Sequence, residues 1–246
     1  AVPTRSQTGV SIVMGPPSAH AARKRTITGR LATTRREWCD AKSGYTRPLA
    51  DAAGAGLSEK RRSITLIVAA QVAAMSLWFV SAAILPDMLL EASISPTAQA
   101  LLSSAVQAGF VVGALASAVF GLADRFDPRR VLALSAMLAA AANLALLAVP
   151  IGGPAAVALR FVTGALLAGD YPVGMKLAVG WGSHDRGFLV GLLVGALTLG
   201  SASPHLAAWV GGADWRMAVT ATSVAAGLGG LLVLAAGLGP HHAGSL

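Results

Sequence analysis

Apolar residues gather into six long stretches, separated by short groups of charged residues, prolines and glycines. A helix needs about 20 mostly apolar residues to cross a bilayer. Cutting the sequence at these groups predicts spanning helices over 63–86, 98–121, 131–149, 155–178, 187–210 and 216–238. Runs of this length are too long for core helices of so small a soluble domain, so the pattern predicts an all-α membrane protein with six transmembrane helices.

Charge is sparse and unevenly distributed. Charged residues make up 12% of the 246 residues, about half of the roughly 25% that is typical of soluble domains. Residues 1–62 hold twelve Lys/Arg and four Asp/Glu, a net of +8, whereas residues 63–246 hold seven of each. The chain therefore divides into a basic N-terminal extension (1–62), a six-helix bundle (63–240) and a short C-terminal tail (241–246).

The extension has little apolar periodicity. Its basic clusters at 23–25 and 35–36 are compatible with nucleic acid, lipid headgroups or an organellar transit peptide. No aromatic interleaving and no folded pattern accompanies the charge. This favours a disordered tail whose charge enforces topology, or an upstream stretch that is not normally translated, and we predict no nucleic-acid partner.

Basic residues favour one side of the predicted bundle. Seventeen belong to the extension, to the loops 124–130 and 179–187, or to Lys176 just before the second loop; the other two are Arg160 and Arg216. Cytoplasmic loops carry an excess of Lys and Arg. Both termini are therefore predicted to be cytoplasmic, in an integral protein of a bacterial inner membrane.

The frame G-x-x-V-G-A-L occurs at 109–115 and again at 191–197, each time in the middle helix of a group of three. Each group runs on to an Ala-Asp pair followed by arginine, at 123–125 and 213–216. Because three helices cross the membrane an odd number of times, a second copy of the group has the opposite orientation. The pattern therefore predicts a 3+3 inverted repeat, which is a plan of secondary transporters. The alternative is generic G-x-x-x-G packing. The glycines predicted to mediate helix packing are Gly109, Gly113, Gly164, Gly191 and Gly195.

The stretch FGLADRFDPRR, 120–130, places five charges within seven residues, between two long uncharged stretches. Pro128 can begin a helix but not continue one, so the third helix is predicted to start at 128–130. Asp124, at the end of the second helix, opposes the dipole of that helix. This suggests that a group outside the helix pair pairs with it; the alternative is that the arginines only anchor the loop in the cytoplasm.

This stretch resembles the helix 2–3 loop of the major facilitator superfamily, commonly G-x-L-A-D-R-x-G-R-R-x-x-L. The matching residues are Leu122, Ala123, Asp124, Arg125, Arg129 and Arg130. Phe120 replaces the first glycine, with Gly121 displaced by one place, and Asp127 replaces the second. The resemblance covers about 63–240 and implies the N-terminal six-helix half of that fold. It also implies that the acid and the arginines pair with a neighbouring bundle as a conformational switch.

The fourth helix supports the same family. Arg160 and Gly164 resemble its R-x-x-x-G signature, in which the arginine is tied to proton coupling. An arginine at mid-membrane costs on the order of 2.5–3.5 kcal/mol on insertion scales, and Arg160 can lower that cost by snorkelling outward. The fifth helix lacks the Gly-Pro pair of the antiporter signature, because Ala196 follows Gly195.

Asp170 falls near the middle of the fourth helix, where a carboxylate is costly unless it is paired or protonated. Ten residues separate it from Arg160, about 15 Å along a helix, so no direct ion pair is expected. We interpret Asp170 and Arg160 as proton-coupling candidates; the alternative for Asp170 is a polar contact with another helix. Lys176 lies on the opposite helix face and is expected to reach the cytoplasmic headgroups.

The resemblance implies that helices one, two, four and five line a central cavity. The substrate-cavity candidates are Gln71, Trp78, Gln107, Tyr171, Thr198 and His205. For Gln71, Gln107 and His205, interhelical hydrogen bonding is an equally good interpretation.

Motifs for catalysis or for cofactors are not found. The serine and histidine of GSASPH, 200–205, have the wrong spacing for a serine nucleophile with its base, and His241 and His242 have no third ligand. A single cysteine, Cys39, excludes an internal disulfide and a cysteine metal cluster. We therefore predict no catalytic residue, no metal and no cofactor.

Together these patterns predict secondary active, proton-coupled transport of a small solute by alternating access. The predicted partners are the lipid bilayer, the solute, protons and a second six-helix bundle. Since a complete member of the family has twelve helices, we expect a truncated carrier rather than two paired copies. The alternative function is a non-transporting six-helix scaffold or partner-binding subunit.

Overall fold

The computed structural model describes residues 56–211 and 214–241, so residues 1–55 of the predicted extension lie outside the described residues. The described residues belong to one unit, Gly56–Leu246. They contain six helices that are long and apolar enough to cross a membrane. The predicted number of spans is therefore confirmed.

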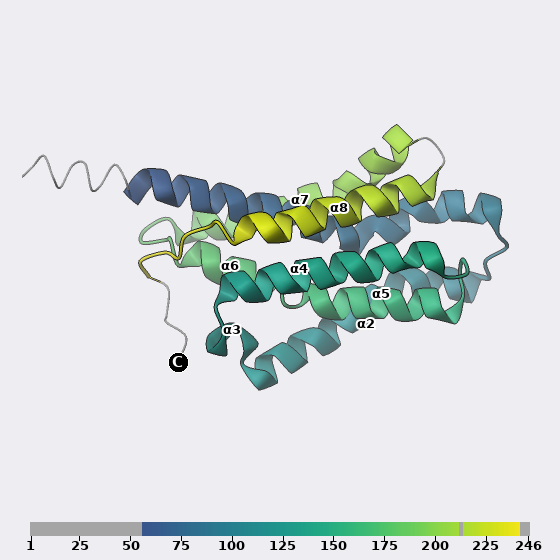
Figure 1. The fold of residues 1–246 in the computed structure, drawn as a ribbon, viewed down its shortest axis with the longest axis horizontal. Coiled ribbons are helices and arrows are strands. Elements are labelled where there is room, and N and C mark those ends of the chain that lie inside the picture. Colours follow the sequence, from purple (N-terminus) through teal and green to yellow (C-terminus); the bar gives the residue numbers. More distant parts are fainter. Residues whose placement is uncertain (1–55, 212–213, 242–246) are drawn as a thin grey trace, which may run out of the picture. The chain divides into compact units, whose positions relative to one another are not determined.

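The helices follow the chain in the predicted order (Figure 1). They are the Gly56–Glu91 helix (called the first helix below), α2 (Pro96–Phe120), α3 (Leu122–Arg125), α4 (Pro128–Leu144) with the 3₁₀ turn η1 (Ala145–Ala148), α5 (Pro154–Leu167), α6 (Tyr171–Val179), α7 (Arg186–Gly211) and α8 (Trp215–Val233). The short α3 lies in the loop between the second and third spans, and α5 and α6 together form the fourth span, Pro154–Val179.

The first helix begins earlier than predicted. Its 36 residues span about 54 Å at 1.5 Å per residue, well beyond a hydrocarbon core of about 30 Å. The charged residues at 59–62 lie within this helix rather than before it. The predicted boundary between the extension (1–62) and the bundle (63–240) therefore falls inside the first helix.

Local sequence sets the helix starts. Pro96, Pro128 and Pro154 occupy first-turn positions of α2, α4 and α5, where a missing N–H costs nothing. Asp127 caps α4 by accepting from Arg129 N, and Asp214 caps α8 by accepting from Arg216 N. Asp127-Pro-Arg and Asp214-Trp-Arg therefore cap the starts of the third and sixth spans in the same way.

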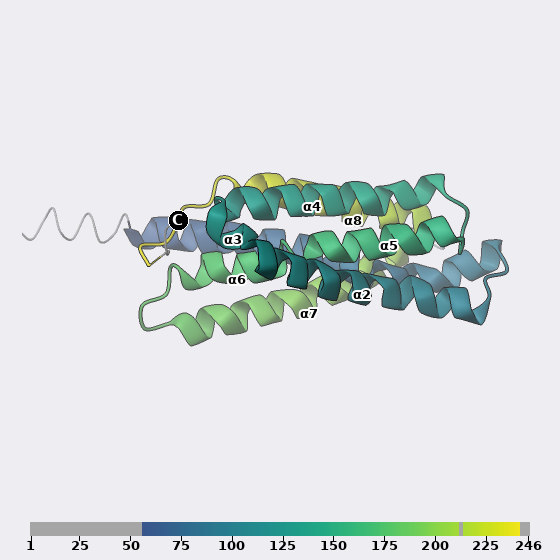
Figure 2. The same ribbon diagram turned by 90° about the horizontal axis from the view of Figure 1, so that it is seen from below.

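A close crossing joins α2 to α5, which lie side by side in Figure 2. A Cβ at Gly109 would collide with the Phe161 carbonyl, and one at Gly164 with the Val106 carbonyl. Gly113 is equally close to Ala165. These three glycines let the two backbones touch.

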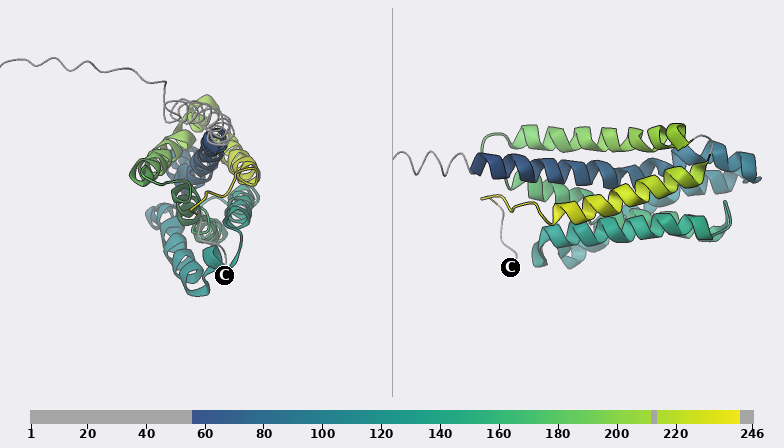
Figure 3. Two further views of the ribbon diagram at one scale, coloured as in Figure 1. Left: turned by 90° about the vertical axis from the view of Figure 1, so that its left-hand side faces the viewer. Right: turned by 45° about the horizontal axis from the view of Figure 1, so that its top comes forward.

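The two predicted packing glycines of α7 behave differently. A Cβ at Gly191 or Gly195 would meet no heavy atom within 4 Å, so, in contrast to the prediction, neither makes a close contact inside the described bundle. The first helix lies between α7 and α8 (Figure 3), where Gly200 of α7 and Gly229 of α8 approach it at Met75 and Ala70.

Candidate functional site

Arg160 of α5 lies inside the bundle and is 0% exposed. Its Nη1 donates to Asn143 Oδ1 of α4 at 2.9 Å, and its Nη2 donates to the carbonyls of Leu77 and Trp78 at 2.9 and 3.0 Å. Asn143 Nδ2 in turn donates to Ser223 Oγ of α8 at 3.0 Å. The arginine therefore joins four spans.

The position of Arg160 differs from the expected snorkelling. Its guanidinium points inward, where Asn143 and two carbonyls of the first helix accept its hydrogen bonds. Asn143 is not among the site residues predicted from the sequence. Its role has a visible signal, because it is the only amide side chain in the third apolar stretch.

Asp170 is also 0% exposed. Its Oδ2 accepts from Nε2 of Gln71, on the first helix, at 2.7 Å. Asp170 Oδ1 and Gln71 Oε1 have no hydrogen-bond partner among the described residues. No described cation pairs with Asp170, so an amide alone faces this carboxyl group.

Asp170 lies at a break in the fourth span, between α5 and α6. Residues 168–170 form a turn in which Gly169 N and Asp170 N reach back three residues, to Leu166 O and Leu167 O. Pro172 explains the break, since it has no N–H to donate to residue 168. The predicted continuous helix over 155–178 is therefore interrupted where its carboxylate lies.

Two glycines make room for polar groups at the break. A Cβ at Gly174 would collide with Gln71 Oε1, and one at Gly169 would collide with Ser135 Oγ of α4. A cavity of about 200 Å³ borders the same place, lined by Ser117, Asp124, Ala168 and Pro172 among others. The buried Asp170 thus lies two residues from cavity-lining positions on either side.

The charged turn is tied to the bundle by Asp124. Lys176 of α6 donates to Asp124 Oδ1 and, at 2.7 Å, to the Ala123 carbonyl. The hydrogen bond from Lys176, and then its charge, lower the pKa of Asp124. Asp124 thus has a partner outside its helix pair, as the sequence suggested, but the partner is the lysine that was expected to reach the headgroups.

The arginines of the turn divide into two groups. Arg129 donates to both carboxyl oxygens of Asp127 and, at 3.1 Å, to the Ala236 carbonyl just after α8. The side-chain hydrogen bond from Arg129 lowers the pKa of Asp127. Arg125 and Arg130 are exposed and form no ion pair with another described residue.

The structure of the turn explains why residues 120–130 depart from the common loop pattern of the family they resemble. Gly121 ends α2 in a left-handed conformation, φ +61°, which favours glycine. The displaced glycine therefore supplies the tight turn, and Asp127 replaces the second glycine as a helix cap.

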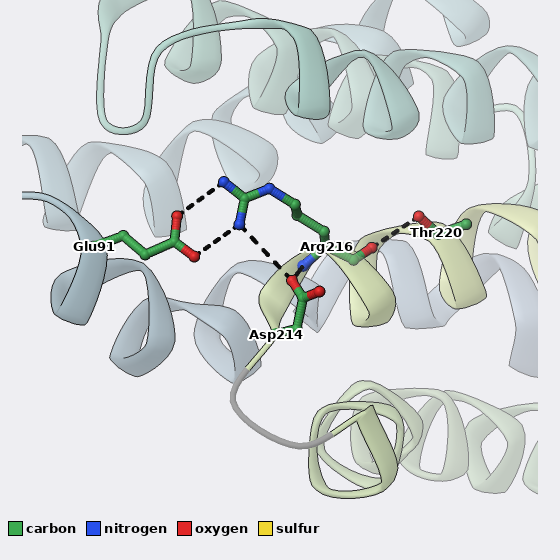
Figure 4. Close-up of polar contacts among 4 residues, drawn as sticks. All are labelled: Glu91, Asp214, Arg216 and Thr220. Carbon is green, nitrogen blue, oxygen red and sulfur yellow. Dashed lines mark hydrogen bonds and ion pairs between the residues drawn. The ribbon is translucent and has the colours of Figure 1, made fainter.

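A second ionic cluster lies at the opposite end of the bundle (Figure 4). Arg216, at the start of α8, donates to both carboxyl oxygens of Glu91 at 2.7 and 2.9 Å, and Asp214 lies 3.8 Å away. The guanidinium also lies 4.6 Å from the Trp215 ring. This cluster joins the end of the first helix to the start of α8.

The cavity candidates fall into two groups. Gln107 of α2 and Thr198 and His205 of α7 are exposed. Gln71 is buried against Asp170, and Tyr171 and Trp78 are half-buried, with the Trp78 ring 4.7 Å from that of Phe110. Among the predicted site residues that the structure describes, Gln71 is thus paired with Asp170, whereas Arg160 lies in a separate network that includes the Trp78 carbonyl.

In a comparison with known protein families, the Major Facilitator Superfamily model matches residues 66–245. The chain belongs to this superfamily. Comparison with curated proteins gives no significant match. Membership makes the chain an integral membrane protein of a transporter family, and its six spans are one half of the twelve-helix fold.

Proposed function

We propose that this superfamily member carries out proton-coupled transport of a small solute by alternating access, with Asp170 binding the coupling proton. The observation that carries the proposal is the Asp170 carboxyl group, which is fully buried and faces one amide and no described cation. An isolated buried carboxylate is costly. A bound proton removes that cost, and its release changes the forces within the bundle.

The break in the fourth span supports access to this group. Interrupted spanning helices occur at transporter binding sites because irregular backbone is tolerated where it borders a cavity. The cavity between Asp124 and Pro172 gives such a border, and we propose that it forms part of the proton route. Arg160 is proposed to hold the first helix against α4 and α8 while Asp170 changes charge.

We also propose that α2 and α7 face a second six-helix bundle across the solute cavity. Their exposed faces carry polar residues, namely Gln107, Thr198 and His205. The end of the bundle with Lys176 and Arg129 is proposed to be cytoplasmic, because loops there hold the basic excess. This orientation fits a bacterial inner membrane.

The proposal is tested in proteoliposomes with an inward proton gradient and a panel of labelled small solutes. Because the proposal requires a second six-helix bundle, the wild-type chain is reconstituted at a density that lets two copies pair, and these pairs are expected to accumulate at least one solute. Asp170→Asn, which keeps the shape but loses the proton, is expected to abolish accumulation and to keep solute exchange. Asp87→Asn, a half-buried carboxylate of the first helix, is the matched control and is expected to accumulate solute normally.

Two results would count against this function. Accumulation by Asp170→Asn at the wild-type level contradicts proton binding at this residue. No flux with any solute, although the wild-type chain is shown to pair in the membrane, favours the non-transporting scaffold.

A further inference from the structure

A groove of about 380 Å³ opens between the beginnings of the first helix and of α7. Its apolar wall is formed by Leu57, Ile64, Phe188 and Leu189. Leu57 and Phe188 are 63% and 69% exposed, so the apolar wall is open to the surroundings of the bundle. None of these residues belongs to the proposed transport site.

The polar side of the groove carries Lys60, Arg61 and Asp185. Lys60 Nζ lies 2.7 Å from Asp185 Oδ2, and this hydrogen bond lowers the pKa of Asp185. The pair is therefore neutral as a unit. Arg61 is exposed and pairs with no carboxylate among the described residues, so the lining keeps one uncompensated positive charge.

The surroundings of the groove add positive charge. Arg62 and Arg186 are exposed beside it in the sequence, and Arg186 donates from Nε to the Gly182 carbonyl rather than to an acid. Glu59 lies toward another face, where it approaches Gly237. The N-terminus of α7 contributes the positive end of its helix dipole.

The groove also lies at the right depth for a lipid. Both helices enter their apolar segments at this end, so the basic residues lie at headgroup level and the apolar wall continues toward the hydrocarbon. Basic pockets between transmembrane helices bind anionic headgroups.

We propose that this groove binds one anionic phospholipid, with the headgroup phosphate at Arg61 and an acyl chain along Phe188. Residues 1–55 of the same chain do not suit the groove, because they hold nine Lys/Arg against three Asp/Glu and would be repelled by its charge. The apolar wall likewise favours a lipid over a soluble acidic peptide.

Native mass spectrometry of the full chain in detergent tests the proposal, with added phosphatidylglycerol or phosphatidylcholine. The wild-type chain is expected to retain one phosphatidylglycerol in preference to phosphatidylcholine. Arg61→Gln is expected to weaken phosphatidylglycerol binding about fivefold, as one basic residue near a lipid surface would. Phe188→Ser should weaken both lipids, since it removes apolar contact from an exposed position that folding does not need.

Arg130→Gln is the matched control, because it removes an exposed arginine outside the groove, and it is expected to bind like the wild-type chain. Equal losses in Arg61→Gln and Arg130→Gln would show general charge attraction and overturn the site. Equal retention of the two lipids by the wild-type chain would overturn its anionic preference. Neither result depends on transport, so the lipid-binding proposal can be wrong while the proposed function is right, and the reverse.

Discussion

Arg160 and Asp170 lie in the same span, yet each has a neutral amide as its side-chain partner. Asn143 accepts from the arginine, and Gln71 donates to the aspartate. The sequence spacing predicted correctly that these two charges do not pair directly. It did not identify the amides, because partner choice depends on how distant helices cross and not on residue spacing along one helix.

The Arg160 network predicts a large effect of one buried amide. Asn143→Leu removes the acceptor of Arg160 Nη1 and the donor to Ser223. A buried polar group without a partner costs about 1–3 kcal/mol, and more when it is charged. We expect the free energy of unfolding in mixed micelles to fall by at least about 1 kcal/mol.

Thr198→Ala is the control for this substitution. The Thr198 hydroxyl is exposed and bonds only to a carbonyl of its own helix, so a change within about 0.5 kcal/mol is expected. If Asn143→Leu were as mild as Thr198→Ala, the network would have no structural importance.

The two lysine–aspartate pairs predict a reciprocal pattern of titration. Lys176 lowers the pKa of Asp124, and Lys60 lowers the pKa of Asp185. Lys176→Gln is therefore expected to raise the pKa of Asp124 toward its ordinary value of about 3.9 and to leave that of Asp185 unchanged. Lys60→Gln should do the reverse, as measured by carboxyl-carbon NMR of labelled aspartate.

The sign of the linked stability follows from the lowered pKa values. Each pair stabilises the folded state fully above the unfolded pKa of about 3.9 and loses this contribution as the pH falls through the lower folded value. A titration in which both lysine variants shift the same aspartate would contradict the pairing.

Among the elements, the helix starts marked by proline were the easiest to predict, whereas the start of the first helix was placed too late. Pro128 begins α4 as expected, and the spans agree with the apolar stretches. The break at 168–170 was missed although Pro172 signals it, because an apolar run of that length indicates a span whether or not its backbone is continuous. The turn after α2 was likewise not predicted, because the sequence alone does not show that Gly121 adopts the left-handed conformation that ends this helix.

The α2–α5 crossing predicts a strong asymmetry between two identical substitutions. Gly164→Ala places a methyl group against the Val106 carbonyl, so the helices must separate. We expect a loss of at least about 2 kcal/mol in the free energy of unfolding, typical of overpacking. Gly195→Ala meets open space and is expected to be neutral or to stabilise by up to about 1 kcal/mol, because alanine favours helices. Similar effects of the two changes would contradict the crossing geometry.

At the scale of the molecule, the faces of the bundle differ in chemistry. Beyond their first turns, which carry Arg130 and Arg216, the exposed large side chains of α4 and α8 are apolar, for example Leu134 and Val224. The exposed faces of α2 and α7 mix apolar residues with Gln107, Thr198 and His205. Sequence periodicity placed these polar residues on helices, but which helices surround the first one follows from the three-dimensional packing.

This difference predicts which faces contact water in a membrane. After Cys39→Ser removes the only native cysteine, single cysteines at Gln107 and Thr198 are expected to react with a membrane-impermeant maleimide. Cysteines at Leu134 and Val224, which are 60% and 52% exposed, are expected to react much more slowly. A thiol facing lipid does not ionise, and the thiolate is the reactive form. All four should react after denaturation in detergent, which shows that each thiol is intact. Equal protection of all four in the membrane would mean that α2 and α7 face lipid or dry protein, and the proposed solute cavity between them and a second bundle would then be wrong.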